Sequence, residues 1–470
     1  MGSAGMALSP LSLASALPGK RMNFVFILVD DLGWSDLGCY GADLHETPNI
    51  DGFSRESLRF SQAYAASPVC TPTRASIMTG KHPARLNMTV WRESTLEDPD
   101  PDRRLLPPQC VSDLPHSEFT IAEALREAGY RTAHIGKWHL GGASHYPETQ
   151  GFDVNIGGSH WGAPETFFYP YRGDSYFGDY RYVPHLDIGE EGEYLTDRLT
   201  DEALAVMERF RDGPFFLNMA YHTVHSPIEG KPELVEYYRK KLREGLHHKN
   251  ATYAAMVHSL DQNVGRILDR IDELGLAGNT VVMIFSDNGG VANRIRGELV
   301  TDNSPLRSGK GSLYEGGIRE PLLVRWPGVT PGGETCDEPV CSTDIYPTML
   351  DVLEMEGNSE QNRGMDGVSF ASLLREPDAS LGRDLLFWHY PHYYPTTTPV
   401  SAVRKGDWKL LEYHEDGRLE LYNLADDLGE KRNLVSEMPA KAKELKRELN
   451  RWKNRVGARL PRENPRFKSK

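Results

Sequence analysis

The sequence predicts an α/β protein with a large mixed, mostly parallel sheet sandwiched by helices, followed by a small C-terminal antiparallel α+β domain. Three observations predict this fold. Apolar runs of strand length alternate with amphipathic helices through most of the chain, which is typical of a parallel sheet covered on both faces. The apolar fraction of 39% is that of an ordinary folded protein. Beyond about residue 385, alternating strands separated by turn residues indicate antiparallel hairpins.

Each element of the larger domain has its own local signal. The first strand is expected at residues 23–29, a continuous apolar run that closes in the turn Asp30-Asp31-Leu32-Gly33. A helix is expected at 120–128, with Gly129 as its stop, and a strand at 131–136. The next expected elements are a helix at 201–211, a strand at 214–221, a long amphipathic helix at 253–274 and a strand at 280–285.

For the C-terminal part, beyond about residue 385, the sequence predicts a hairpin followed by a helix. Residues 400–413 and 418–422 alternate apolar and polar side chains around Glu415-Asp416-Gly417, a hairpin pattern. A charged helix is expected at 439–456, and the basic end after Leu460 is expected to fray. The predicted division is a leader or disordered N-terminus at 1–21, a large α/β domain at 22–385 and a C-terminal α+β subdomain at 386–470.

Charge and hydropathy exclude two classes of partner. The net charge of −14 argues against nucleic acid, whose phosphates need a basic surface, but one pocket can still be locally basic for a small anionic substrate. No apolar run approaches the roughly 20 residues of a membrane-spanning helix, so we expect no stable membrane association.

The N-terminus supports two interpretations. Residues 6–17 are modestly apolar and Ala14-Ser15-Ala16 could be a cleavage site, but no Lys or Arg precedes them. A leader would send the protein to the periplasm or outside the cell, which is our expectation. A cytoplasmic protein with a disordered N-terminus is the alternative.

The five cysteines are too few and too scattered for a disulfide scaffold, and no CxxC pair indicates zinc. Cys336 and Cys341 could form a bridge, although two buried thiols are the favoured interpretation.

Polar residues follow two of the predicted strands. Asp30 and Asp31 end the first strand, and Asp287 and Asn288 follow the strand at 280–285. Ligands of open α/β sheets bind beyond the carboxyl ends of the strands. Carboxylate and amide oxygens suit a hard cation, Ca²⁺ rather than Zn²⁺. The alternative is that the two motifs are unrelated turn caps.

Residues 70–80, CTPTRASIMTG, add a third feature. Pro72 near a helix start places Cys70 at the N-terminus of a helix, where backbone N–H groups favour an anion; a buried structural cysteine is the alternative.

This string resembles the signature of the type I sulfatases, arylsulfatase-like enzymes of the alkaline phosphatase superfamily. In these enzymes the cysteine of C-x-P-x-R is oxidised to formylglycine. The resemblance runs from Asn23 to about Leu434 through VDDLGWSDLGCYG, GKWHLG, SDNGG, GKGSLYEGGIREP and GDWKLLEY.

The resemblance implies a site, residue by residue. One Ca²⁺ is expected, with the formylglycine at Cys70 beside it and the remaining ligands supplied by Asp30, Asp31, Asp287 and Asn288. Formation of formylglycine implies a maturation enzyme as a partner. The residues expected around the nucleophile are Arg74 and Lys137, which would hold it, His139 against its hydroxyls, and His225 and Lys310 facing the ester oxygen and the sulfate. Of His222 and His225, which are neighbours in the sequence, His225 is the one expected to face the ester.

The implied chemistry explains these residue types. One hydroxyl of the hydrated aldehyde attacks sulfur and displaces the alcohol; deprotonation of the second hydroxyl then expels sulfate. The cation, with Lys137, Lys310 and Arg74, offsets charge on the sulfate oxygens. We expect His225 to protonate the leaving alcohol and His139 to take the proton of the second step.

The predicted function is therefore hydrolysis of a sulfate monoester, and the expected substrate is a sulfated carbohydrate. Loops at 157–182 and 388–394 mix aromatic rings with His160, Arg172, His389 and His392, which suits a hydroxyl-rich ring; ordinary loop packing is the alternative. An exo-acting enzyme on a galactose- or hexosamine-type sulfate is the first expectation. The alternatives are a phosphate or phosphonate monoester hydrolase on the same fold, and a non-catalytic protein that binds sulfated glycans.

Overall fold

The computed structural model describes residues 21–175, 178–295 and 297–467. The expected leader at 1–21 lies outside the described residues apart from Arg21, so both interpretations of it stay predictions. Within the described ranges, no helix combines the length and the apolar character needed to cross a membrane.

The main sheet has nine strands in the order β13-β2-β12-β9-β1-β8-β4-β5, with β14 also paired to β2. The five strands from β9 to β5 run parallel, whereas β12 is antiparallel to both of its neighbours. The predicted mixed, mostly parallel sheet is confirmed. Its strands are β1 Asn23–Val29, β2 Leu58–Tyr64, β4 Arg131–Gly136, β5 Val154–Ile156, β8 Phe215–Ala220, β9 Thr280–Ser286, β12 Arg319–Arg325, β13 Thr335–Cys336 and β14 Val340–Cys341.

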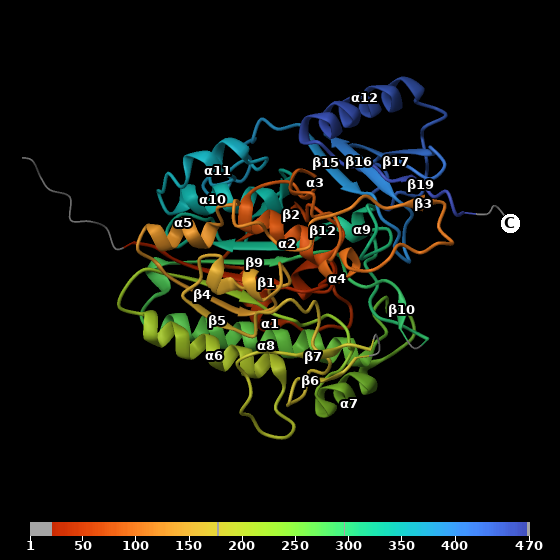
Figure 1. The fold of residues 1–470 in the computed structure, drawn as a ribbon. Helices are drawn as coiled ribbons and strands as arrows, with labels where there is room; N and C mark the ends of the chain where they lie inside the picture. The colour runs from red at the N-terminus through yellow and green to blue at the C-terminus, as the bar shows by residue number, and fades with distance from the viewer. Residues whose placement is uncertain (1–20, 176–177, 296, 468–470) are drawn as a thin grey trace, which may run out of the picture.

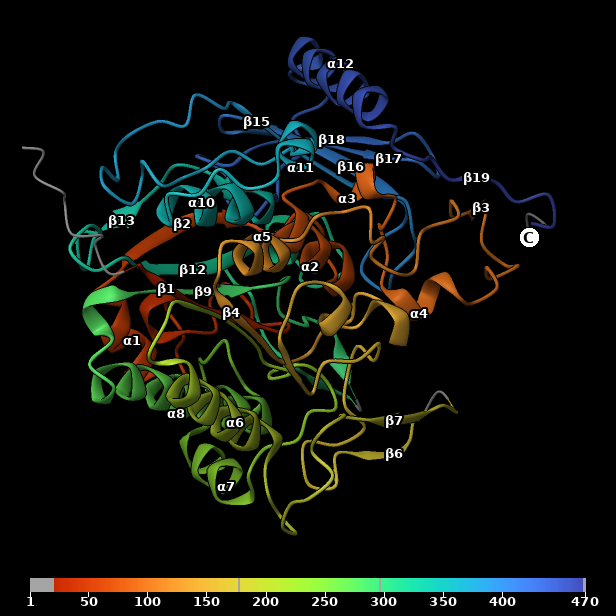
Figure 2. The ribbon, with the colours of Figure 1, turned by 60° about the vertical axis from the view of Figure 1, so that its left-hand side comes forward.

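Helices cover both faces of this sheet, as Figures 1 and 2 show. Phe24, Phe26 and Leu28 of β1 belong to the core on one face, and the intervening Val25 and Ile27 belong to the core on the other. Burial on both faces explains why the strand is a continuous apolar run. The helices are α2 Cys70–Thr79, α5 Ile121–Glu127 and α10 Ile345–Val352 on the first face, and α1 Pro48–Ser54, α6 Leu195–Phe210 and α8 Ala251–Glu273 on the second.

The expected elements of the larger domain are all present, and one differs in extent. Helix α6 begins at Leu195 rather than at residue 201. Its first turns bury Leu195 and Leu199 in the core but also bury Thr196 and Thr200. Those buried polar side chains conceal the apolar periodicity from which the helix was predicted.

The predicted C-terminal antiparallel structure is confirmed, with one correction. Residues 400–413 are not one arm of a hairpin but two strands, because Gly406 turns the chain with a positive φ of 55°. The second sheet contains β15 Leu385–Tyr390, β16 Val400–Lys405, β17 Trp408–Tyr413 and β18 Leu419–Asn423, and α12 Pro439–Val456 contacts it. The domain boundary at residue 385 stays a prediction.

A buried ion network fixes this second sheet against the first. The Lys409 ammonium of β17 lies 2.8 Å from the Glu315 carboxylate and 3.0 Å from that of Glu430. Glu315 is the first residue of α9 (Glu315–Ile318) and lies five residues after Lys310, so the network also anchors the segment that contains this predicted site residue. The remaining elements are α3 Pro83–Leu86, α4 Arg92–Thr95, β3 Leu105–Leu106, β6 Arg172–Asp174, β7 Tyr180–Tyr182, α7 Pro232–Lys241, β10 Arg294–Ile295, β11 Glu298–Leu299, α9 Glu315–Ile318, α11 Ser359–Gly364 and β19 Arg462–Glu463.

Two smaller expectations have opposite outcomes. All five cysteines are free thiols, and Cys336 and Cys341 pair with Phe60 and Tyr64, four residues apart along β2. The favoured interpretation of two buried thiols is confirmed. The expectation of a frayed end after Leu460 is wrong for the described residues, because β19 pairs antiparallel with β3.

Candidate active site

The polar residues predicted to meet at the edge of the sheet do so. Asp30 and Asp31 follow β1, Asp287 and Asn288 follow β9, and all four are fully buried. The two strands are parallel neighbours with Val29 opposite Ser286, so their carboxyl ends coincide. The alternative of two unrelated turn caps does not describe this arrangement, because the motifs contact each other directly.

Hydrogen bonds lock the two strand ends together. The Asp31 N–H donates to Asp287 Oδ1 (3.2 Å), and Asn288 Nδ2 donates to Asp31 Oδ1 (2.7 Å). The Asp287 N–H donates to the Val29 carbonyl (3.1 Å). The carboxylates are therefore held by backbone that the sheet itself positions.

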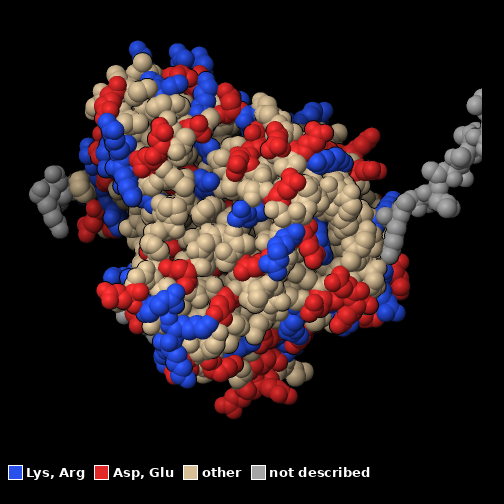
Figure 3. All heavy atoms as spheres, turned by 180° about the vertical axis from the view of Figure 1, so that it is seen from behind, with Lys and Arg blue, Asp and Glu red and all other residues tan. Residues whose placement is uncertain are grey.

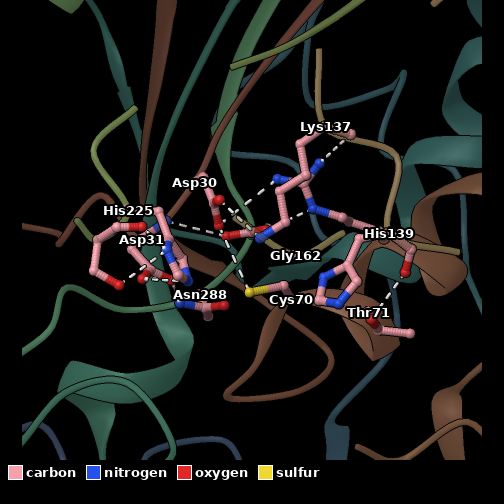
Figure 4. A network of polar contacts seen from close by, with 12 residues as sticks. Asp30, Asp31, Cys70, Thr71, Lys137, His139, Gly162, His225 and Asn288 are labelled. Carbon is pink, nitrogen blue, oxygen red and sulfur yellow. Dashed lines mark hydrogen bonds and ion pairs between the residues drawn. The ribbon is translucent and has the colours of Figure 1, made fainter. Parts of the chain in front are cut away.

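Cys70 is the first residue of α2, as predicted, and it is buried. Its thiol donates to Asp30 Oδ1 (3.6 Å) and lies 3.5 Å from the Lys310 Nζ. One donor atom from each of Asp30, Asp31, Cys70 and His225 lies within 4.8 Å of the others. Figure 4 shows these side chains converging on one point.

Arg74 lies one helical turn after Cys70 and therefore faces the same site. Its Nε donates to Asp287 Oδ2 (2.8 Å) and its Nη1 donates to the Lys137 carbonyl (2.7 Å). The third nitrogen, Nη2, is buried 3.8 Å from Asp30 Oδ1 and has no hydrogen-bond partner among the described residues. It is a free donor that points toward the carboxylates.

Two lysines neutralise the aspartates after β1. The Lys137 Nζ lies 2.7 Å from Asp30 Oδ2, and the Lys310 Nζ lies 2.7 Å from the Asp31 carboxylate. Burial acts to raise the pKa of Asp31, but Lys310, His225 and Lys137 together outweigh burial and hold that pKa below its usual range. Burial likewise opposes the charge of Lys310, and the Asp31 carboxylate raises its pKa well above the usual value. Both partners are therefore ionised in the folded protein.

The two neighbouring histidines occupy different places. His225 Nε2 lies 3.5 Å from Asp31 Oδ2, while its Nδ1 lies 2.7 Å from the Ser226 carbonyl. Burial, together with Lys137 and Arg74, holds the pKa of His222 well below its usual value. The structure brings His225, and not His222, into the cluster around Cys70.

His139 lies close to the start of α2 and has a partner that the sequence analysis missed. Its carbonyl accepts from the Thr71 hydroxyl (2.9 Å), one residue after Cys70. Its Nε2 lies 2.6 Å from Glu93 Oε2 in α4, and Glu93 Oε1 accepts from the Gly162 N–H (2.9 Å). His139 Nδ1 is buried with no partner among the described residues. No sequence signal marks Glu93, because it precedes its partner by 46 residues and belongs to no motif.

The aromatic loops have mixed outcomes. His389 and His392 are buried and bond to protein groups: His389 Nδ1 lies 2.7 Å from Ser401 Oγ and His392 Nε2 lies 2.8 Å from Thr89 Oγ1. They fit the alternative of ordinary packing, and the expected loop at 388–394 is wrong in part, because His389 belongs to strand β15. His160 and Trp161, with ring centroids 4.1 Å apart, precede Gly162 and so lie near Glu93. Arg172 is exposed in β6.

The cluster of residues 30, 31, 287 and 288 has the donor set of a hard divalent cation. Asn288 Oδ1 is buried with no hydrogen-bond partner among the described residues, although a buried amide oxygen is normally satisfied. The other donors are carboxylate oxygens, which suit Ca²⁺. The residues present therefore fit such an ion. Asp287 also accepts a hydrogen bond from Arg74.

Comparison with known proteins agrees with this geometry. The family profile described as Sulfatase matches residues 22–355, and that described as N-sulphoglucosamine sulphohydrolase, C-terminal, matches residues 309–455. A protein of Formosa agariphila named Sulfatase is 32% identical, with 95% of this chain and 92% of that protein covered. Human arylsulfatase A is 33% identical, with 90% of this chain and 86% of that protein covered. The crystal structure of Ps i-CgsB in complex with k-i-k-neocarrahexaose is 27% identical, with a TM-score of 0.77 and 95% of each chain covered. The chain belongs to the sulfatase family and is an enzyme that hydrolyses sulfate esters.

Proposed function

We propose that this sulfatase hydrolyses sulfate monoesters of a carbohydrate with a formylglycine formed from Cys70. The observation that carries the proposal is the position of the Cys70 thiol. It lies at the first residue of α2, 3.6 Å from an Asp30 oxygen and 3.5 Å from the Lys310 ammonium. Once matured, the residue would supply a hydroxyl as the nucleophile toward sulfur.

The residues around Cys70 bind and orient the anionic ester. Lys310 and Lys137 are charged and buried, and Arg74 has one free N–H pair. Such fixed cations stabilise charge on the sulfate oxygens more strongly in a buried site than in water. A divalent cation held by Asp30, Asp31, Asp287 and Asn288 would add to that stabilisation, and Ca²⁺ is the ion we propose.

Two histidines handle the protons in this proposal. His225 Nε2, on the Asp31 side of Cys70, would pass a proton to the leaving oxygen. On the Thr71 side, His139 Nδ1 would accept one from the nucleophile's second hydroxyl. Glu93 is the positioning residue for His139, because a carboxylate on Nε2 holds a proton there and leaves the lone pair on Nδ1.

The carbohydrate assignment rests on relatives and on the loop beside Glu93. Human N-acetylgalactosamine-6-sulfatase is 32% identical, with 84% of this chain and 75% of that protein covered. Ps i-CgsB has been crystallised with a carbohydrate. In the present chain His160 and Trp161, whose rings are tilted by 43° to each other, lie next to Gly162, and such aromatic rings suit a sugar. Membership of the sulfatase family favours a sulfate ester over the phosphate or phosphonate ester of the alternative. It also favours an enzyme over a non-catalytic protein that binds sulfated glycans.

A substrate panel tests the proposed function. We expect a sulfated galactose or hexosamine to have a higher kcat/KM than an aryl sulfate, because the loop contacts act on a sugar. Aryl phosphate should be slower than aryl sulfate. An aryl sulfate turned over far faster than every sugar would refute the carbohydrate assignment, and faster phosphate hydrolysis would refute the preference for sulfur.

The nucleophile can be tested independently of the substrate. Peptide mass spectrometry of protein from its native host should find an aldehyde or its hydrate at position 70. Cys70→Ala should lose at least ~10³-fold in kcat/KM, as removal of a nucleophile does, with an unchanged melting temperature. An unmodified thiol in fully active protein would show that the nucleophile is elsewhere.

The metal site is tested by removing the unpartnered oxygen. Asn288→Ala should reduce bound Ca²⁺, measured by elemental analysis, and raise the Ca²⁺ concentration needed for activity. Asn218→Ala is a matched control, since Asn218 Oδ1 is also buried and unpartnered but belongs to the middle of β8. Equal metal content in wild type and Asn288→Ala would contradict the ligand assignment.

The role of Glu93 is tested by exchanging its carboxylate for an amide. Glu93→Gln keeps the shape, but its NH₂ can donate to Nε2 and so shift the His139 proton to Nδ1. We expect kcat to fall about 10²-fold, the usual range for general acid–base catalysis, with KM changed less than about threefold. Glu118→Gln, which breaks a similar pair with Lys81, should leave kcat unchanged. A KM effect without a kcat effect would assign Glu93 to substrate binding.

A further inference from the structure

A second group of buried side chains that can bind a metal lies outside the active site. One donor atom from each of Asp36, His45 and His248 lies within 4.8 Å of the others, and all three residues are buried. Asp36 lies in the loop after β1, whereas His45 and His248 each lie three residues before a helix, α1 and α8 respectively. These two helices contact each other on one face of the sheet (Figures 1 and 2). Packing of the helices therefore brings the two imidazoles together.

The spacing of the donor atoms is close to that of ligands around one ion. His248 Nε2 lies 3.3 Å from Asp36 Oδ1, and His45 Nδ1 lies 3.7 Å from the same oxygen. The centroids of the two imidazole rings are 4.3 Å apart. Ligands that bind zinc at about 2.0–2.1 Å in a tetrahedral arrangement lie roughly 3.3–3.4 Å from one another. A small movement of the His45 ring would complete three corners of such a tetrahedron.

The Nε2 atom of His248 is an independent indication of a ligand. His248 is only 3% exposed, and its Nε2 has no hydrogen-bond partner in the part of the chain that the structure describes. A buried polar atom is normally hydrogen-bonded. The nitrogen lies 3.3 Å from a carboxylate oxygen without forming a hydrogen bond to it. Two neighbouring ligands of one ion are placed in this way, close together but directed at a third atom.

The groups around the cluster hold its ligands in place. His248 Nδ1 lies 2.8 Å from Asp43 Oδ1, and a carboxylate on the second ring nitrogen is typical of a histidine that binds zinc. Asp43 is itself fixed, because it accepts the backbone N–H groups of His247 (2.6 Å) and His248 (3.1 Å). On the other side of the cluster, the Thr301 hydroxyl donates to Asp36 Oδ1 (2.5 Å).

Asp36 connects the cluster to the active site. Its second oxygen, Oδ2, accepts from the Gly33 N–H (2.7 Å) and from the Tyr253 hydroxyl (2.6 Å). The same hydroxyl lies 3.3 Å from the carbonyl oxygen of Asp31. The Asp36 carboxylate therefore supports the turn after β1, and a ligand that fixes this carboxylate also fixes the turn that contains Asp31.

We propose that Asp36, His45 and His248 bind a structural Zn²⁺ ion that stabilises the turn after β1. Two imidazole nitrogens and one carboxylate suit zinc or a similar transition metal, whereas the oxygen donors at Asp30 and Asp31 suit Ca²⁺. The fourth position of the ion is left to water. This ion takes no part in the hydrolysis of the ester, because it lies behind the turn rather than beside Cys70.

A divalent cation can approach the cluster from the surface. The Asp43 side chain, which contacts His248, is 27% exposed. A surface pocket lined in part by Gly41 and His247 adjoins the same loops. The protein has a net charge of −14, and acidic side chains are spread among the basic ones over the face shown in Figure 3. Such a surface favours the approach of a cation.

A proton on His248 is the alternative to a metal ion. Burial opposes a charge on this ring, but Asp36 and Asp43 raise its pKa to about 9. A protonated His248 could therefore lie between the two carboxylates with no ion present. In that case His45 Nδ1 would donate to the Asp36 carbonyl oxygen, which is 3.0 Å away.

The metal content of the full-length protein distinguishes these two states. Protein purified with excess Ca²⁺ is treated with a chelator that prefers transition metals to Ca²⁺, incubated with Zn²⁺, desalted and analysed for both elements. We expect about one Zn²⁺ per chain, bound by the folded protein. The double variant His45→Ala, His248→Ala should lose this Zn²⁺. Its matched control, His116→Ala, His145→Ala, removes another pair of neighbouring imidazoles, with centroids 4.5 Å apart, and should keep it.

Three further measurements test the site even if the double variant does not fold. Asp43→Asn keeps an oxygen for the backbone N–H groups but removes the charge beside His248 Nδ1, so Zn²⁺ affinity should fall about 10–100-fold. At constant Ca²⁺, wild type should melt at a higher temperature with Zn²⁺ than without it. Co²⁺ in place of Zn²⁺ should give the visible absorption of a four-coordinate ion.

Equal Zn²⁺ content in wild type and the double variant would overturn the proposal, because the ion would then be bound elsewhere. Folded wild type that binds no Zn²⁺ would also overturn it, and the cluster would then be a set of ion pairs around a protonated His248. None of these measurements uses sulfatase activity, so this proposal and the proposed function succeed or fail separately.

Discussion

Mutual compensation of buried charges is the interaction on which the rest of the active site depends. Three carboxylates and three cations are enclosed together, and an unpaired ion there would cost several kcal/mol. They form three contacts of 2.7–2.8 Å: Lys137 with Asp30, Lys310 with Asp31, and Arg74 with Asp287. The same cations are those that an anionic ester requires. In the proposed function, a divalent cation on the carboxylates would leave these side chains free for the sulfate oxygens, so the charges that let the site fold would also bind the ester.

This balance requires that the charges arrive at fixed positions, and the parallel sheet provides them. β1, β9 and β4 end at the same edge, and Lys137 directly follows Gly136. Gly136 has a φ of 99°, and a Cβ there would lie 1.9 Å from the Ala220 carbonyl oxygen. Only glycine allows that approach, through which the Lys137 N–H donates to the same oxygen at 2.7 Å. The position of Lys137 is therefore fixed by the backbone of two strands rather than by a mobile loop.

The parts of the site that sequence could predict are those with a local signal. Asp30 and Asp287 follow apolar strands, and Pro72 marks the helix start at Cys70, so each position follows from its neighbours in the chain. Lys310 and His225 were expected only from resemblance to a family. Glu93 could not be predicted, because its role depends on a contact with His139 that folding creates.

The same limit explains the error about the C-terminal end. A polar, arginine-rich tail with few apolar residues has no reason to be ordered when it is considered alone. Asn464 orders it through carbonyl groups 361 and 363 residues earlier in the chain. Backbone carbonyls carry no sequence signal, so these partners of Asn464 could not be predicted from composition.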